Sequence, residues 1–468
     1  MKQKIKDMLL SSFFIRWGNR ASARVSGFLR SSAIAAWFCG EKEERRAIDR
    51  LLSRLIDGKF CEFLRSSVLL GLLMKIPGLA WISLLVTVIG ATFLPTLIVM
   101  ILSLMTLALT VIGVVFRKET LPPLPNAVVF WAVYAGITLI YTFIGYGGSQ
   151  GMLAGGIRFC MLPVMPCAFV LLSKGDRMWK SVCVLTGAAL PVGLYGLFQF
   201  VTGQMSAKWT DTALFSEDFG RLTATFENPN IYGAFLLIAL PVAVAVTMRV
   251  KGWRGKVFFG GTALVLAANM VLTYSRGCYV ALLVILAVCL CRKDIRWAIP
   301  MVLAAAASPL YLPQSVMARF QSIGNMSDTS TSYRLNIWRG SMAMLGDFWW
   351  VGVGIGDVAF RSIYEKYALS TVEDAPHAHN LILQTMCETG ILGLAALVLA
   401  FVFCFRRAYS VQKTMPAGRE RTISLVWCAV WLGLLFQGMT DFIFYNNNLF
   451  CIMMFSLGAM IVKGEKNE

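Results

Sequence analysis

The chain has 468 residues, of which 57% are hydrophobic and 15% are charged, and its mean hydropathy is +0.67. Soluble domains contain about 45–50% apolar and about 25% charged residues, so the composition excludes soluble enzymes, disordered scaffolds and secreted disulfide modules. The net charge of +18 therefore bears on membrane orientation and not on nucleic acid, for which we expect no binding. We predict an all-α polytopic membrane protein.

The first 65 residues differ from the rest of the chain. They contain 14 Lys or Arg and 7 Asp or Glu, and no apolar stretch long enough to cross a bilayer. Within them, residues 41–65 are typical of a basic amphipathic helix, with Ile48, Leu51, Leu52, Leu55 and Ile56 on one side. We expect a cytoplasmic extension that either lies on the anionic inner leaflet or is simply solvated.

Membrane spans begin after residue 65. Residues 76–116 contain no charge and are long enough for two helices, with a break near Phe93–Pro95. Further apolar segments follow at 126–146, 152–173, 181–202, 230–248, 257–275, 277–291, 295–312, 381–405, 422–440 and 446–462. The sequence thus predicts about twelve transmembrane helices. Nine fall in residues 66–312, a large extracytoplasmic loop occupies 313–379, and three more spans with a cytoplasmic tail occupy 380–468.

Basic residues give the orientation. With the amino terminus in the cytoplasm, the inside connections and tail carry 19 Lys or Arg, as the positive-inside rule requires. We therefore expect a multi-pass protein of the inner (cytoplasmic) membrane with both termini in the cytoplasm. Nine basic residues then fall on or near the outer side: Arg158, Lys208, Arg221, Arg276, Arg319, Arg334, Arg339, Arg361 and Lys366. Those at helix mouths or in short loops are candidates for binding an anion.

Polar residues mark one face of the helix expected after the large loop. Asn380, Gln384 and Glu388 recur at intervals of four, so they form one stripe, and His379 precedes it. Glu388 would lie about 12 Å into the bilayer, where a carboxylate needs a polar cavity or a cationic partner. The alternative is a stripe of hydrogen bonds that only holds helices together.

Two other patterns carry less chemistry. The sequence VGVGIGD at 351–357 lacks the strand and βαβ unit of a dinucleotide site, so we interpret it as a tight turn that returns the loop to the membrane. The twelve cysteines are scattered and form no C-x-x-C pair. We therefore expect cysteines that pack as small apolar residues, and no metal site.

Four stretches carry a resemblance to a known family. They are RLTATFENPNIYGAFL at 221–236, TYSRGCYVALL at 273–283, YRLNIWRG followed by VGVGIGD at 333–357, and AHN, LQ and ETGILGL at 378–394. In this order and spacing, the chain resembles the O-antigen ligase and polysaccharide polymerase superfamily over roughly residues 76–460. The first 65 residues are not covered by this resemblance.

The resemblance implies a glycosyltransferase that needs neither metal nor cofactor. Members take a glycan from undecaprenyl pyrophosphate at the outer face of the cytoplasmic membrane and pass it to a hydroxyl of a glycan, a lipid-linked glycan or a protein. By motif, the essential histidine corresponds to His379 and the essential arginines to Arg221 and Arg276, and Arg334 matches a recurrent arginine of the outer loop. Ligase and polymerase activity both stay open, as does the acceptor.

These residue types suit that chemistry. Arginine presents a permanently charged fork to phosphate oxygens, and a neutral histidine can accept the proton of an attacking hydroxyl. We take His379, Arg276 and Arg221 as candidate catalytic residues.

Other readings stay open for several of these residues. Arg276 could instead anchor its helix at the interface, and Arg221 could pair with Glu227 or Asp218. His377 is expected to tune its neighbour. We take as candidate substrate-binding residues Arg334, Asn380, Gln384, Glu388 and Arg158. The alternative function is a transporter or flippase of lipid-linked oligosaccharide, although we find no internal repeat.

Overall fold

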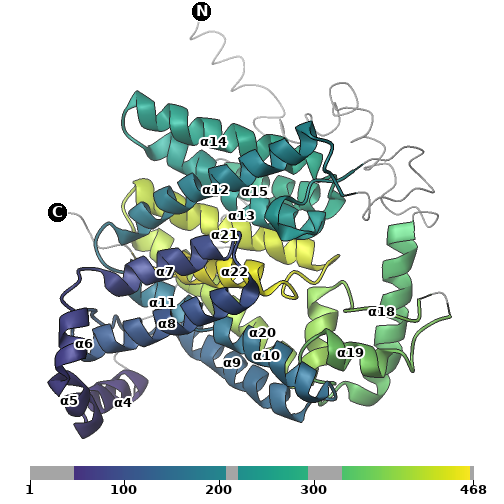
Figure 1. Ribbon diagram of the computed structural model, residues 1–468, viewed down its shortest axis with the longest axis horizontal. Coiled ribbons are helices and arrows are strands. Elements are labelled where there is room, and N and C mark those ends of the chain that lie inside the picture. Colours follow the sequence, from purple (N-terminus) through teal and green to yellow (C-terminus); the bar gives the residue numbers. More distant parts are fainter. Residues whose placement is uncertain (1–46, 207–219, 294–328, 371, 464–468) are drawn as a thin grey trace, which may run out of the picture.

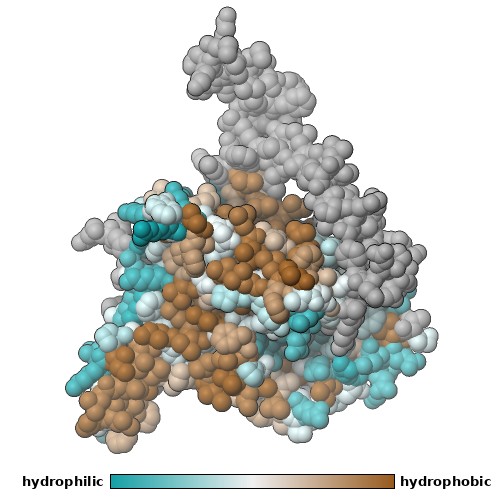
Figure 2. Space-filling model, turned by 45° about the horizontal axis from the view of Figure 1, so that its top comes forward, coloured by the Kyte–Doolittle hydropathy of each residue, from teal (hydrophilic) through white to brown (hydrophobic). Residues whose placement is uncertain are grey.

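The computed structural model describes residues 47–206, 220–293, 329–370 and 372–463. These residues form helices and one isolated bridge between Ser206 and Arg221. Figure 1 shows most of the long helices running roughly along the long axis of the molecule, with α18 and α19 at one end. In the space-filling view, hydrophilic surface lies along the upper left edge and at the lower right, and hydrophobic surface covers much of the centre and the lower left (Figure 2). This arrangement is the one expected of a helix bundle that spans a membrane.

The helices follow the apolar segments of the sequence. Their bounds are α4 Ala47–Ile56, α5 Lys59–Ser66, α6 Val68–Leu73, α7 Leu79–Gly90, α8 Thr96–Val115, α9 Asn126–Ile144, α10 Gly148–Met161, α11 Val164–Leu172, α12 Arg177–Val201, the 3₁₀ turn η2 Ala224–Phe226, α13 Pro229–Arg249, α14 Trp253–Leu272, α15 Arg276–Lys293, α18 Thr329–Phe348, α19 Asp357–Tyr364, α20 Leu381–Thr414, α21 Arg419–Gly438 and α22 Asn447–Met460.

Eight helical segments among the described residues are long and apolar enough to cross a membrane, and α7 and α22 are shorter apolar helices. The predicted break near Phe93–Pro95 is confirmed, because α7 ends at Gly90 and α8 begins at Thr96. A helix is also confirmed over 277–291, where α15 lies. The span expected at 295–312 lies outside the described residues, so the total of twelve stays a prediction.

The amino-terminal extension is helical where it is described. α4 and α5 expose the large apolar side chains of Leu51, Leu55, Phe60 and Phe63. Arg65, in α5, connects this extension to the helix bundle, since its Nε donates to the carbonyl oxygen of Val115 at the end of α8 (2.8 Å). An exposed apolar face next to a membrane helix fits a segment that lies in the interface.

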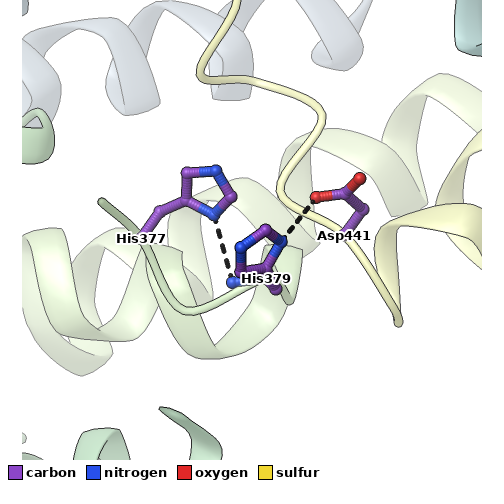
Figure 3. A group of neighbouring side chains, drawn as sticks. All are labelled: His377, His379 and Asp441. Carbon is purple, nitrogen blue, oxygen red and sulfur yellow. Dashed lines mark hydrogen bonds and ion pairs between the residues drawn. The ribbon is translucent and has the colours of Figure 1, made fainter. Parts of the chain in front are cut away.

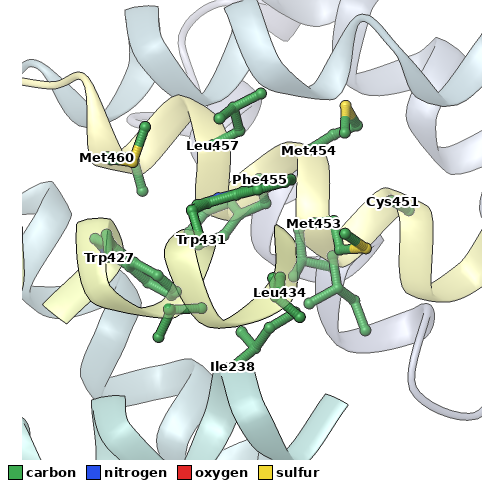
Figure 4. Packing of buried hydrophobic residues seen from close by; sticks show 14 of the residues in the cluster. Ile238, Trp427, Trp431, Leu434, Cys451, Met453, Met454, Phe455, Leu457 and Met460 are labelled. Carbon is green, nitrogen blue, oxygen red and sulfur yellow. The ribbon is translucent and has the colours of Figure 1, made fainter. Parts of the chain in front are cut away.

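The core of the bundle lies around α21 and α22. Trp431, Leu434 and Phe455 are fully buried there, and Figure 4 shows their side chains filling the space between the two helices and α13. The indole Nε1 of Trp431 donates to Oγ of Ser456 (3.1 Å), which satisfies its one polar group. These two helices therefore hold the segment between them, residues 439–446, at a defined place.

The helix α20 is broken near its first third. Gly390 has φ 61° and ψ −167°, which interrupts the helical hydrogen bonds at membrane depth, where free backbone groups are very costly. Residues 349–354 supply the missing partners. The backbone N–H of Val353 donates to Cys387 O (2.7 Å), and that of Gly354 donates to Glu388 O (3.0 Å). The N–H of Ile391 in turn donates to Trp349 O (2.9 Å).

Glycines make this insertion possible. Gly352 and Gly354 have φ of 76° and 104°, and a Cβ on Gly354 would lie 2.4 Å from Cα of Gly145, at the end of α9. The segment VGVGIGD is therefore more than the simple turn expected from the sequence. It is a strip of backbone inserted between the α9–α10 junction and the break in α20.

We predict that Gly354→Ala lowers the free energy of unfolding by about 2–4 kcal/mol, because a new methyl group would meet backbone atoms that cannot move aside and would sit at positive φ. Gly346→Ala is the matched control, since Gly346 is helical and has no atom within 4 Å of an added Cβ. Thermal unfolding of the purified variants measures both. Equal stability of the two variants would contradict the close backbone approach.

Candidate functional site

A histidine–aspartate pair lies at the mouth of α20 (Figure 3). Nδ1 of His379 is 3.1 Å from Oδ1 of Asp441. Because a carboxylate accepts, this contact puts the proton of a neutral His379 on Nδ1 and leaves Nε2 as a proton acceptor. The side chain of His379 is 19% exposed and that of Asp441 is 7% exposed. The imidazole is thus reachable from outside while its carboxylate partner is covered.

The backbone around His379 is held in an unusual conformation. His379 has φ 46°, in the left-handed region that few non-glycine residues adopt. Asn380 follows as the N-cap of α20, with Oδ1 accepting from the N–H of Leu383 (3.0 Å). Its Nδ2 donates to the carbonyl oxygen of Met439 (2.8 Å). Asn380 therefore ties the loop that carries His379 to the loop that carries Asp441.

His377 supports its neighbour. Its Nδ1 accepts a hydrogen bond from the backbone N–H of His379 (3.2 Å), and its ring stacks on Tyr445, with 4.7 Å between centroids. Burial, and then the proximity of His379, lower the pKa of His377 to about 3. A ring that stays neutral at physiological pH and accepts through Nδ1 can hold the His379 backbone. The role of His377 as a tuning neighbour stays a prediction.

The Asp441 carboxylate is ionised at the pH of a cell. Burial alone raises its pKa, but the hydrogen bond and charge of His379 and the positive charge of Arg334 together outweigh burial, so the pKa lies well below its usual range. Arg334 lies on α18, in the segment for which we predicted an outer loop. The structure therefore brings this predicted arginine near enough to act electrostatically on the pair.

Arg221 is held against the start of α13 and the end of α14. Its Nε donates to the carbonyl oxygen of Thr273 (2.9 Å) and its Nη2 donates to Oδ1 of Asn230 (3.0 Å). Oδ1 of Asn230 also accepts from Oγ of Ser275 (2.9 Å), the residue directly before Arg276. Asn230 thus joins the two segments that carry the predicted catalytic arginines. Asp218, one of the two acidic residues expected as a possible partner of Arg221, lies outside the described residues.

Two contacts join the arginine segments to the histidine segment. Gln437, whose carbonyl oxygen accepts the N–H of Asp441 (3.1 Å), donates through Nε2 to the carbonyl oxygen of Asn230 (3.3 Å). Asn228 donates through Nδ2 to the hydroxyl of Tyr445 (2.9 Å), on which His377 stacks. Four segments distant in sequence, 221–230, 273–276, 377–380 and 437–445, therefore form one site.

A buried ion pair lies behind the site. Nη1 of Arg158, on α10, is 2.5 Å from Oε2 of Glu388 on α20, and both side chains are buried. The other oxygen of Glu388 accepts from Nε2 of Gln384 (3.1 Å) and from the backbone N–H of Gly356 (3.3 Å). The cationic partner expected for Glu388 is thus Arg158.

This ion pair is connected to both halves of the histidine–aspartate pair. Oε1 of Gln384 accepts from the N–H of Ala378, next to His379 (2.7 Å). The guanidinium of Arg158 lies over the ring of Phe442, next to Asp441, at 5.3 Å from the centroid. The contacts of Arg158, Gln384 and Glu388 favour a role in positioning the site. Their predicted contact with substrate stays a prediction.

Among the described residues, one group could hold a metal ion. His377, His379 and Asp441 each offer one ligand atom, and these atoms lie within 4.8 Å of one another. However, Nδ1 of His377 is occupied by a backbone N–H and Nδ1 of His379 contacts the carboxylate. These two contacts are the ones expected of a hydrogen-bonded acid–base group.

The sequence patterns missed two residues of this site. Asp441 is the acidic residue in a short segment between the last two predicted spans. The predicted topology puts this segment on the same side of the membrane as His379, which could have marked Asp441 as a candidate. Asn230 stands in ENPNIYG at the start of α13, where its side chain could have been taken for an ordinary cap. Neither residue is spaced three or four positions from the histidine or the arginines, so no helical pattern connects it to them.

We predict that Glu388→Gln lowers the free energy of unfolding by about 3–5 kcal/mol, because it leaves Arg158 buried without a counter-charge. The double variant Arg158→Met/Glu388→Met should lose less than the sum of its single variants. The control is the exposed pair Arg361–Asp374 (2.7 Å), whose disruption should cost about 1 kcal/mol or less. Thermal unfolding of the wild type, the two single Met variants and the double variant gives the coupling free energy between the two residues. Losses of stability that simply add in the double variant would contradict a buried ion pair.

Part of the chain is similar to a known family. A search of curated proteins gives no match. A family model described as O-Antigen ligase matches residues 261–398. The matched segment contains Arg276, Arg334, His379 and the ion-paired Glu388, whereas Asp441 lies beyond it. Residues 261–398 are thus similar to the O-antigen ligase family.

Proposed function

We propose that this protein is an O-antigen ligase-type enzyme of polysaccharide assembly, which transfers a glycan from an undecaprenyl-pyrophosphate carrier to an acceptor hydroxyl. The observation that carries the proposal is the His379–Asp441 pair (3.1 Å), joined through Asn230 and Tyr445 to the segments of Arg221 and Arg276. Ligase and polymerase differ only in the acceptor, and the geometry serves both.

His379 activates the acceptor. Its Nε2 accepts the proton of the attacking hydroxyl, while Asp441 keeps the other nitrogen protonated and stabilises the imidazolium that forms. This is the division of labour between base and carboxylate that serine hydrolases use. General base catalysis of this kind contributes about 10²–10⁴-fold. Asn380 and His377 fix the backbone of His379, so the imidazole does not need to be reoriented at each turnover.

The arginines stabilise the leaving group. As the acceptor oxygen bonds to the anomeric carbon, the bond from that carbon to the diphosphate oxygen breaks, and its electron pair leaves with undecaprenyl diphosphate. Arg221, Arg276 and Arg334 supply positive charge where this negative charge develops. A single displacement of this type inverts the anomeric centre. Because three arginines occupy the role that a divalent cation would otherwise fill, we propose that transfer is metal-independent.

The carrier needs apolar surface near the site. An apolar cavity of about 40 Å³ lies between α7, α12, α13, α21 and α22, with Thr92 and Phe235 in its lining. Oγ1 of Thr225, in the loop that follows Arg221, donates to the carbonyl oxygen of Thr92 (2.5 Å). We propose that the polyprenyl chain of the donor approaches Arg221 along this apolar side of the bundle. We place this end of the bundle on the outer side of the membrane, as the basic connections require.

We predict that Arg221→Gln lowers kcat for glycan transfer by about 10²–10³-fold, because it removes the charge that offsets the leaving diphosphate. Arg221→Lys should recover little of this, since an ammonium cannot make two parallel hydrogen bonds. The assay uses purified protein, a synthetic undecaprenyl-pyrophosphate glycan and an acceptor, with and without EDTA. EDTA should change nothing.

Controls separate this effect from misfolding and from general loss of charge. Thermal unfolding of the Arg221 variants identifies any that fail to fold, and Arg361→Gln removes a cation from the outer loop at an exposed ion pair. Full activity of Arg221→Lys, or activity that EDTA abolishes and Mg²⁺ restores, would overturn the mechanism. Movement of the donor across the bilayer without a new glycosidic bond would instead favour the flippase.

A further inference from the structure

A basic cavity lies at the other end of the bundle. It has a volume of about 290 Å³, and its lining includes Arg249, Arg292, Gln412, Gly418, Arg421 and Thr422. These residues come from the ends of α13, α15, α20 and α21. None of them belongs to the histidine–aspartate site or to the segments joined to it.

The positions of the helices show how far apart the two sites are. α13 begins beside Asn230 and ends at Arg249, α15 begins at Arg276 and reaches Arg292 in its last turn, and α21 begins at Arg419 and ends beside Asp441. Each has about 20 residues, and a helix rises 1.5 Å per residue, so the cavity lies roughly 30 Å from the catalytic end. This is about the thickness of a bilayer core.

The charge around the cavity is one-sided. Arg249, Arg292 and Arg421 all contribute to its wall, and within the described ranges none of the three forms an ion pair with a carboxylate. Nε of Arg249 donates to Oγ1 of Thr422 (2.9 Å), and the Arg292 guanidinium lies 5.6 Å from the ring centroid of Tyr409. These two contacts orient guanidinium groups without neutralising them. Three cations around one cavity repel each other unless an anion joins them.

The first turn of α21 lines the same cavity. α21 begins there, its N-cap Gly418 provides no side-chain cap, and an added Cβ at Gly418 would meet no atom within 4 Å. The first N–H groups of a 20-residue helix and its dipole favour an anion at this place. Glu420 is the one acidic residue in the first turn of α21, and it does not line the cavity. The arginines and the helix start therefore favour the same ligand charge.

We propose that this cavity is a binding site for a phosphate group, supplied by an anionic lipid headgroup or by free phosphate. Arginine forks match phosphate oxygens, and a basic pocket between helices at the membrane surface is where a headgroup can reach. The inference goes beyond glycan transfer, because the ligand binds at the end of the bundle opposite to His379. It assigns the three arginines a ligand that the transfer reaction does not use.

The test is equilibrium binding to purified full-length protein in detergent, with three probes: phosphatidylglycerol, diacylglycerol without phosphate, and inorganic phosphate. The variants are Arg249→Gln, Arg292→Gln and Arg421→Gln. Arg254→Gln is the matched control, because Arg254 is an exposed arginine at the start of α14 that does not line the cavity. His379→Ala separates this site from the catalytic one.

Each pocket variant should weaken binding of phosphatidylglycerol by about fivefold, the effect of one arginine near a headgroup, while Arg254→Gln and His379→Ala bind as the wild type does. Diacylglycerol should show no difference between variants. If inorganic phosphate binds and the same three variants weaken it, free phosphate is a ligand in its own right. Binding of both phosphate probes that is equal in all variants, or no binding of either, would overturn the proposal.

Discussion

The architecture depends on one constraint, which is that backbone polar groups in a bilayer must find partners within the protein. α20 breaks at Gly390, and residues 349–354, between α18 and α19, satisfy the broken turn with hydrogen bonds of 2.7–3.0 Å. The segment that carries α18 and α19 is thereby fixed to the membrane helices at the level of Glu388. A loop that only lay on the surface could not hold Arg334 and the start of α20 in a constant relation.

This fixed point explains how the site is positioned. Glu388 lies within the broken turn, receives the N–H of Gly356 from the inserted loop, and pairs with Arg158. The same hydrogen-bonded chain continues through Gln384 to Ala378, the residue before His379. On the other side, α21 and α22 pack tightly and present Asp441 between them. The proposed catalytic pair therefore lies where two rigid supports meet, as a preorganised acid–base group requires.

Local patterns predicted what depends on neighbours in sequence. The Phe93–Pro95 break was foreseeable because proline cannot continue a helix, and the i, i+4 spacing of Gln384 and Glu388 correctly indicated side chains that meet. The need of Glu388 for a cation also followed from its depth.

The partners of Glu388 and His379 could not be predicted, because they are distant in sequence. Arg158 is 230 residues from Glu388, and Asp441 is 62 residues from His379. Gly390 was missed for a related reason. Glycine is common in membrane helices, and only the inserted loop makes a break there stable.

The most direct measurement of the central claim is a double-mutant cycle on His379 and Asp441 in the glycan-transfer assay. If the carboxylate acts through the imidazole, Asp441→Asn should lower kcat by about 10²–10⁴-fold. The double variant His379→Ala/Asp441→Asn should then be no slower than His379→Ala alone. Losses that multiply in the double variant, or an Asp441→Asn protein with full activity, would show that the two residues do not act as one catalytic pair.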